Sequence, residues 1–188
     1  MLSIIGICLR AFLLLIAALV LGLSVTLAKH QAVGQVPPET GFSTFAGASG
    51  FVASVVGMAA LWFDCIDGKI VMGLDALVSI FYLAGSISLT VAMRSVSSCS
   101  ATDKVSEYNR VTNKILSGGC ITIEGNLVCL HAATSGGKDL TPGRCSMAQA
   151  DYVWEYVGFS LGVLMVFTGY LLSRRGRGGT PTANASYN

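Results

Sequence analysis

Four long apolar blocks constrain the fold of this chain more than any other feature of its sequence. They fall at about residues 4 to 28, 44 to 63, 70 to 93 and 152 to 172. A helix needs roughly 20 apolar residues to cross the hydrocarbon core of a bilayer, and each block meets that length. Charged residues make up 12% of the chain, against about 25% in a soluble domain. The sequence therefore predicts an all-α membrane protein with a four-transmembrane-helix bundle.

A cleavable signal peptide is the alternative interpretation of the first block. Arg10 precedes an apolar run, and Thr26, Leu27 and Ala28 loosely fit a small-residue cleavage site. Apolar residues also precede Arg10, however, and the whole stretch is long enough to span a membrane. We therefore favour a retained helix and four spans.

Four spans place both termini on the same side of the membrane. Basic residues near the helix ends are more frequent on that side (Arg10, Lys69, Arg174, Arg175 and Arg177) than on the other (Lys29, Arg94 and Arg144). The positive-inside rule then predicts cytoplasmic termini. Residues 1–175 would form the helical domain and residues 176–188 a short cytoplasmic tail, with an outer loop at residues 95–151.

This outer loop holds four cysteines, an even number on what would be the oxidising face. Three pairings are open. We favour Cys99 with Cys145, which closes the loop near the third and fourth helices, and Cys120 with Cys129, which closes a small β-hairpin around residues 124–126. Free thiols and a zinc site are the less favoured alternatives, because the face is oxidising and His131 stands alone without CxxC spacing. The loop has too few large apolar residues for a substantial core of its own, so we expect disulfides to supply much of its order.

Arg10 and Asp75 are the two ionisable residues singled out within the predicted spans. An unpaired charge there costs several kcal/mol, so each needs a partner or an escape to the interface. Both lie on the order of 10 Å from the inner helix ends, at a rise of 1.5 Å per residue, which makes a pair plausible. The alternatives are an arginine that extends to the headgroups and an ion or proton relay in a small transporter or channel subunit.

Small residues recur at helical spacing in the second and fourth blocks. Gly158 and Gly162 form a GxxxG motif with Gly169 two turns further on, and Gly50 and Gly57 belong to a similar stripe. Such stripes allow close helix packing, within one bundle or between copies. Cys8 and Cys65 lie near the inner interface, where palmitoylation and a free, half-buried thiol are equally good interpretations.

No catalytic or metal-binding motif occurs in the sequence. HExxH, P-loop and GxSxG patterns are missing, and neither His30 nor His131 has an obvious acid, base or metal partner. The 12 basic and 10 acidic residues form no long run that would favour nucleic acid. We therefore expect no enzymatic activity, no metal, no cofactor and no nucleic-acid partner.

Two segments resemble a known family. LDALVSIFYLAGSISLTVAMRSVSSC at residues 74–99 and GRCSMAQA at residues 143–150, followed by an apolar helix, are similar to the fungal MARVEL-domain tetraspans of the non-classical export protein type. The Arg10 and Asp75 pair is also similar to the charged pair of the plant Casparian-strip membrane proteins. The likeness covers the four-helix layout, while its specific motifs lie in the second half of the chain.

The resemblance implies a plasma-membrane protein with cytoplasmic termini that organises membrane microdomains, including the eisosome compartment and its sphingolipid response, with a role in non-classical export. It implies partners among membrane lipids, such as sphingolipid or sterol, and among membrane proteins, including further copies of the chain. Its structural signature would be Asp75, Arg94, Cys99 and Cys145. Cys120 and Cys129 depart from the family pattern as an added pair, which puts shared partners in doubt.

Overall fold

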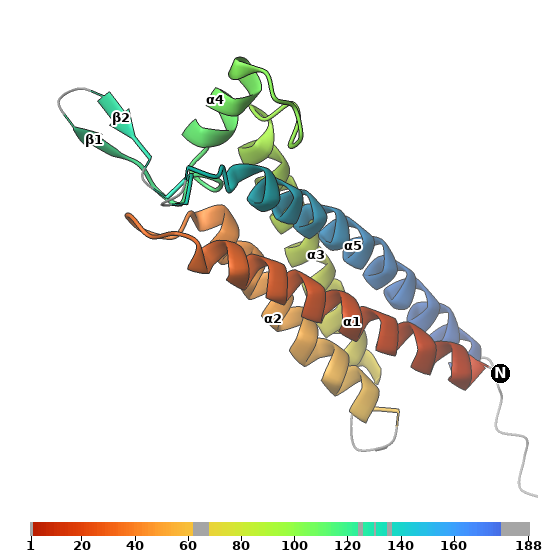
Figure 1. Cartoon of the computed structure of the whole chain (residues 1–188). Helices are drawn as coiled ribbons and strands as arrows, with labels where there is room; N and C mark the ends of the chain where they lie inside the picture. The colour runs from red at the N-terminus through yellow and green to blue at the C-terminus, as the bar shows by residue number, and fades with distance from the viewer. Residues whose placement is uncertain (1, 62–67, 124–125, 130, 135–136, 178–188) are drawn as a thin grey trace, which may run out of the picture.

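The computed structural model describes residues 2–61, 68–123, 126–129, 131–134 and 137–177. Within these residues four long helices form a bundle: α1 (Leu2–Lys29), α2 (Pro38–Ala59), α3 (Gly68–Met93) and α5 (Thr141–Arg177) (Figure 1). All four are long and apolar enough to cross a membrane. The predicted all-α, four-transmembrane-helix architecture is therefore confirmed.

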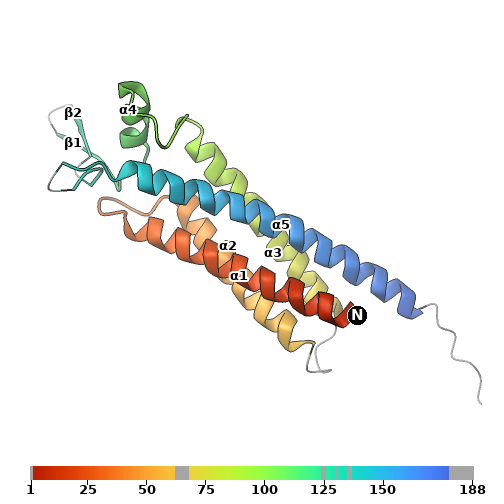
Figure 2. The same ribbon diagram turned by 45° about the vertical axis from the view of Figure 1, so that its right-hand side comes forward.

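The four helices pack in a ring. Helix α1 contacts α2 and α5, and α3 contacts the same two helices from the other side. Figure 2 shows the long, roughly parallel course of the bundle in a second view. Each helix thus has one face toward the interior of the bundle and one face toward the outside, as a membrane bundle requires.

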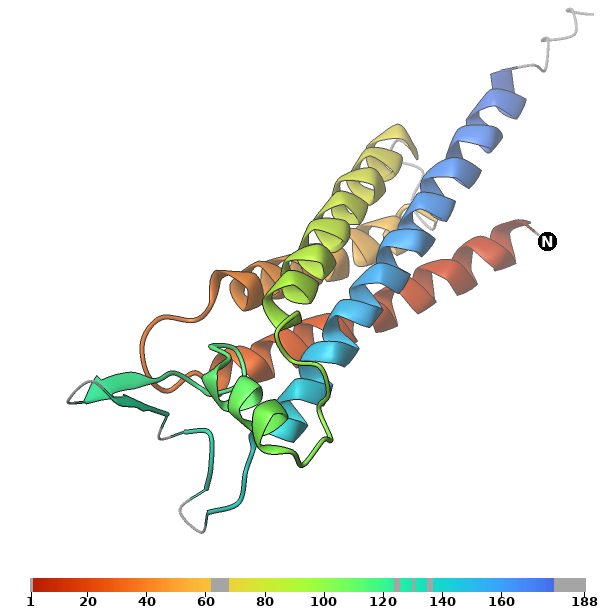
Figure 3. The same ribbon diagram turned by 90° about the horizontal axis from the view of Figure 1, so that it is seen from above.

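The two ends of the bundle differ. One end, which we call the loop end, carries the short helix α4 (Lys104–Thr112) and a hairpin of β1 (Ile121–Ile123) and β2 (Asn126–Val128) (Figure 3). At the other, which we call the terminal end, α1 begins and α5 finishes. Both described ends of the chain therefore lie on the same side, as four spans require.

Two helix starts differ from the sequence prediction because hydropathy alone set the predicted boundaries. Helix α2 begins at Pro38 rather than near 44, with proline in its first turn and Glu39 beside the positive helix terminus. Helix α5 begins at Thr141 rather than near 152. Its first turns are too polar to register as a span, yet they continue the helix into the loop end.

The outer loop is more ordered than its composition suggests. The hairpin forms as predicted, with Ile121 opposite Val128, although residues 124–125 of its turn lie outside the described residues. Helix α4 was not predicted; its N-cap is Asp103, whose carboxylate accepts a hydrogen bond from the Ser106 amide at 2.9 Å. Ile115 and Leu116 are almost fully buried against the helix ends. The loop therefore gains its order from the bundle as well as from disulfides.

Two apolar clusters make up the core. The first lies at the loop end and joins the loop to the helices: Leu27, Leu89, Met93, Val96, Ile115, Leu116, Cys145 and Ala148. The second lies deeper in the bundle: Ile16, Val20, Ala46, Ala53, Val78 and Tyr82. Buried polar residues lie between and beyond these clusters, and they are the groups most relevant to function.

Candidate functional site

Arg10 of α1 and Asp75 of α3 form a two-pronged ion pair inside the bundle. Arg10 Nη1 donates to Asp75 Oδ1 at 2.6 Å, and Nη2 donates to Oδ2 at 2.5 Å. The two side chains are only 6% and 8% exposed. An arginine that extended to the headgroups would not be buried in this way, so the structure contradicts that alternative. Parallel hydrogen bonds and mutual neutralisation make the buried pair tolerable.

Small groups make room for this pair. A Cβ atom added at Gly57 would lie 2.5 Å from the guanidinium carbon of Arg10, so the α2 backbone lies directly against that group. Ser79 donates its hydroxyl to the Asp75 carbonyl oxygen at 2.6 Å. Beside the pair is a cavity of about 20 Å³, which Asp75, Ser79 and Tyr82 line together with Gly50 and Gly158. That volume corresponds to about one water molecule.

The predicted glycine stripes pack inside the bundle. Side chains at Gly158 and Gly50 would collide with the ring and hydroxyl of Tyr82, and one at Gly162 would collide with Ser79. Gly169 is looser, because its nearest neighbour, the Met72 sulfur, would lie 3.8 Å away. The sequence left open whether these stripes pack within one bundle or between copies. Four of the glycines make contacts within one chain: Gly50, Gly57, Gly158 and Gly162.

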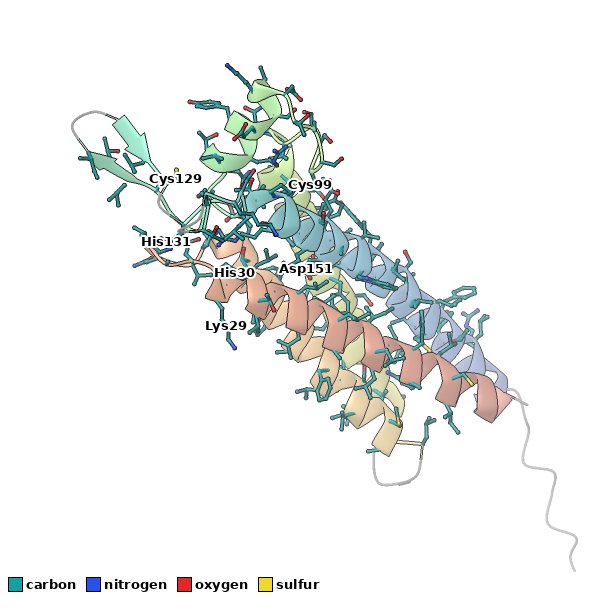
Figure 4. The ribbon with its side chains drawn as sticks, viewed as in Figure 1. Lys29, His30, Cys99, Cys129, His131 and Asp151 are labelled. Carbon is teal, nitrogen blue, oxygen red and sulfur yellow. A yellow bond between two sulfur atoms is a disulfide. The ribbon has the colours of Figure 1, made fainter. Side chains whose placement is uncertain are left out.

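Sequence reasoning missed two buried acids, Asp151 and Glu155. Both lie on α5 and are fully buried. Ser24 of α1 donates to Asp151 Oδ2 at 2.6 Å, and Figure 4 shows Asp151 where α1 and α5 run together toward the loop end. Glu155 falls inside the predicted span 152–172, so its charge alone could have revealed it. Asp151 was hidden because the helix was taken to begin after it.

Two buried arginines order the loop end, one by joining the outer loop to α5 and one by bonding within the outer loop. Arg144 of α5 donates to the Leu116 carbonyl at 2.9 Å, and Arg110 of α4 donates to the Ala101 carbonyl at 2.8 Å. Both are almost completely buried. Arg94, expected as part of the structural signature, is instead exposed at the loop end of α3. At this end of the bundle, Arg144 and Arg110 are thus the arginines that make buried hydrogen bonds.

The short connection between α1 and α2 is also tied to the outer loop. The amides of Ala32 and Val33 donate to the Gly118 carbonyl at 2.9 and 3.2 Å. Gly118 and Gly119 have φ angles of 74° and 99°, a conformation that favours glycine. Burial and the nearby Arg144 charge lower the pKa of the adjacent His30, so this imidazole stays neutral to a lower pH than a free histidine.

Two disulfides complete the loop end. They join Cys99 to Cys145, with Cα atoms 5.5 Å apart, and Cys120 to Cys129, with Cα atoms 4.2 Å apart. This is the pairing favoured from the sequence. The first links the segment after α3 to the first turns of α5, and the second closes the hairpin.

The remaining predicted residues lie apart from the buried groups. Cys8 is a free, exposed cysteine on α1, whereas Cys65 lies outside the described residues, as does the tail from residue 178. Arg174 lies over the Tyr170 ring at 5.2 Å, and His131 is exposed. Among the described residues, no group of three or more histidine, cysteine, aspartate or glutamate side chains is placed to hold a metal ion.

A comparison with protein families decides what kind of membrane protein this is. The family model described as MARVEL, a membrane-associating domain, matches residues 3–171. The chain belongs to the MARVEL family. The match spans all four long helices and the outer loop, so the disulfides and the buried charges lie within the MARVEL domain. No curated protein and no solved structure gives a significant match.

Membership of the family, together with four apolar helices, identifies a membrane-associated, multi-pass protein. Within the spans of this MARVEL domain, Arg10, Asp75 and Glu155 are buried in the interior, whereas many large apolar side chains lie on the outer surface. Its chemistry is therefore divided between an outer surface suited to lipid and an inner set of buried polar residues.

Proposed function

We propose that this MARVEL protein organises membrane microdomains through lateral association with lipids and with other membrane proteins. The observation that carries the proposal is a family match over nearly the whole chain to a membrane-associating domain. In this proposal the chain acts by association and carries out no reaction.

The outward surface of the helices supports lateral association. Large apolar side chains are exposed along all four spans, including Leu15, Val52, Ile80 and Phe167. The only solvent that suits such a surface is hydrocarbon or another apolar protein face. Lipids and partner proteins would therefore contact the bundle through this apolar surface.

An aromatic cluster between α2 and α3 is the most distinctive part of that surface. The Phe45 ring lies 5.2 Å from the Phe81 ring, and Phe42 lies 6.3 Å from the same ring, edge to face. Phe45 is 53% exposed. Rigid aromatic faces give large contact areas at low entropic cost, so we expect this aromatic cluster to contact sterol or sphingolipid.

The finer assignment follows the sequence resemblance. We place the protein in the fungal non-classical export type, at the plasma membrane, with cytoplasmic termini and a role in an eisosome-like compartment. Cys8 would then be a palmitoylation site, because its exposed thiol lies near the start of α1.

Two measurements test the proposal. A fluorescent fusion should form patches at the plasma membrane that redistribute when sphingolipid synthesis is blocked. In giant vesicles with coexisting lipid phases, Phe45→Ala should reduce partitioning into the ordered phase, whereas Val105→Ala, exposed on α4 outside the spans, should not. A uniform distribution that ignores lipid composition would contradict the proposal.

A small transporter or channel subunit is the alternative function. It would use the Arg10 and Asp75 pair, but both hydrogen bonds of this pair are already made within the chain. That geometry favours a structural role for the pair. Purified protein in liposomes that carried protons or ions, with the flux lost in Asp75→Asn, would reverse the order of the two proposals.

A further inference from the structure

A polar layer crosses the bundle between its two apolar clusters. On α1 and α3 it lies between residues of the loop-end cluster and residues of the deeper cluster, on α2 it lies at the helix start, and on α5 it follows Ala148 of the loop-end cluster. Its members are fully or almost fully buried: Ser24 on α1, Thr40 and Ser43 on α2, Ser86 on α3, and Asp151 and Glu155 on α5. Four helices thus contribute oxygen atoms to one level of the interior.

Two carboxyl groups at this level have no cationic partner. Among the described residues, the ion pairs involve other acids, and the nearest buried arginine on the same helix, Arg144, donates to a backbone carbonyl. Two carboxylates one helical turn apart repel each other inside a bilayer. Each of these carboxyls that is ionised therefore needs a positive charge beside it.

Neutral oxygen groups from a second helix face the same place. The Ser43 hydroxyl lies next to the Glu155 carboxyl, is 0% exposed and has no aligned hydrogen-bond partner. Thr40, one turn nearer the loop end, has a buried hydroxyl that also lacks a partner. Both Glu155 oxygens and Asp151 Oδ1 are likewise unpartnered. Buried polar atoms in native proteins normally have partners, so this concentration points to a bound ligand.

The backbone of α3 closes the other side of the layer. A Cβ atom at Gly85 would lie 2.7 Å from Glu155 Oε1, so glycine is what allows the carboxyl to fit against α3. Along α1, Ser24 is five residues from the helix end at Lys29, or about 7 Å of helix. The layer is thus close to the loop end and remote from Arg10, about 21 Å further along α1.

We propose that this layer binds one small monovalent cation, sodium, through the carboxyl groups of Asp151 and Glu155 and the hydroxyl of Ser43, with one of the two carboxyls ionised and the other protonated. All the ligands are oxygen atoms, which suit hard cations. A monovalent ion has a smaller dehydration cost than a divalent one at a buried site. The ion enters from the loop end and neutralises the ionised carboxyl, which links the packing of α1, α2 and α5 to the ion composition on that side.

Full-length protein in nanodiscs tests the proposal through its melting temperature in sodium chloride and in choline chloride at equal ionic strength. Saturating sodium should raise the melting temperature by on the order of 5 °C. Glu155→Gln should lose this increase, and Ser43→Ala should weaken sodium affinity by about tenfold. Glu107→Gln, an exposed α4 residue, is the matched control and should behave like the original chain. Equal melting temperatures in the two salts would overturn the proposal.

A second measurement remains informative if Glu155→Gln folds poorly. A hydrophobic carbodiimide modifies protonated carboxyls within the bilayer, so it should label Glu155 and Asp151 in choline, and sodium should reduce this labelling by holding one of the two carboxyls in its ionised form. Labelling that is the same in both salts would show that the acids hold only protons and would overturn the cation site. Mass spectrometry of the modified peptides identifies the labelled residue.

Discussion

The bundle buries two sets of acids, and they differ in how their charge is neutralised. Asp75 is matched by Arg10 through two hydrogen bonds within the same chain. Asp151 and Glu155 have a serine donor and unpartnered hydroxyls around them but no described cation. The first set is complete in itself and so stabilises the fold; the second is incomplete and so is suited to an external ligand. A buried charge is therefore a candidate functional group when no residue of the chain neutralises it, and burial by itself is not enough.

The largest effect should come from breaking the complete pair. Asp75→Asn leaves the Arg10 charge buried without its counter-ion, and we expect a loss of about 3–5 kcal/mol in unfolding free energy. Arg10→Ala should cost a similar amount, and the double variant less than the sum, when stability is measured by denaturant titration in detergent micelles. Fully additive losses would show that the two residues do not act as a pair.

Removing the disulfide near the acidic layer should have the next largest effect. Cys145→Ser opens a link between residues 46 positions apart, and we expect a loss of about 2–4 kcal/mol. The variant should also migrate more slowly on non-reducing gels. Cys8→Ser, which removes a free thiol, is the control and should migrate normally. Identical migration of the original chain with and without reductant would contradict the disulfide.

The close packing around the complete pair can be tested with two glycines of the same helix. Gly162→Ala would force a methyl group into Ser79, next to Asp75, and should cost about 1–3 kcal/mol. Gly169→Ala meets nothing closer than 3.8 Å and should be neutral or slightly stabilising, because alanine favours helix. Equal losses at both positions, measured by thermal unfolding, would show that the contact in the bundle is not the cause.

The smallest expected effect concerns α4, which lies outside both acid sets. Hydrogen bonding by the Ser106 amide lowers the pKa of the Asp103 carboxyl. Its contribution to α4 is therefore present above the ordinary carboxyl pKa and is lost as the pH falls through the lowered value. The Ser106 amide resonance should shift on acidification, and Asp103→Ala should abolish that shift, while Glu107→Gln should keep it. A shift that persists in Asp103→Ala would exclude this cap as its cause.

Hydropathy and residue type predicted the four spans, the hairpin at residues 121–128 and the choice of disulfide partners, because these depend on local composition and spacing. The pairing of Arg10 with Asp75 followed from their equal depth. Helix α4 and the early start of α5 were missed because tertiary contacts, such as burial of Leu116, stabilise segments that are locally polar. The acidic layer was missed because it combines four helices, and a single glutamate in an apolar block shows neither its neighbours nor their lack of partners.

The central proposal about this four-span MARVEL bundle is its orientation: we propose that the stapled loop end lies outside the cell and the terminal end inside. The most direct test labels intact cells with a membrane-impermeant maleimide before and after reduction, with single-cysteine variants to assign the sites. The proposal predicts that reduction exposes Cys99, Cys120, Cys129 and Cys145 while Cys8 and Cys65 stay protected. Labelling of Cys8 or Cys65 in intact cells, or continued protection of the four loop cysteines after reduction, would contradict it.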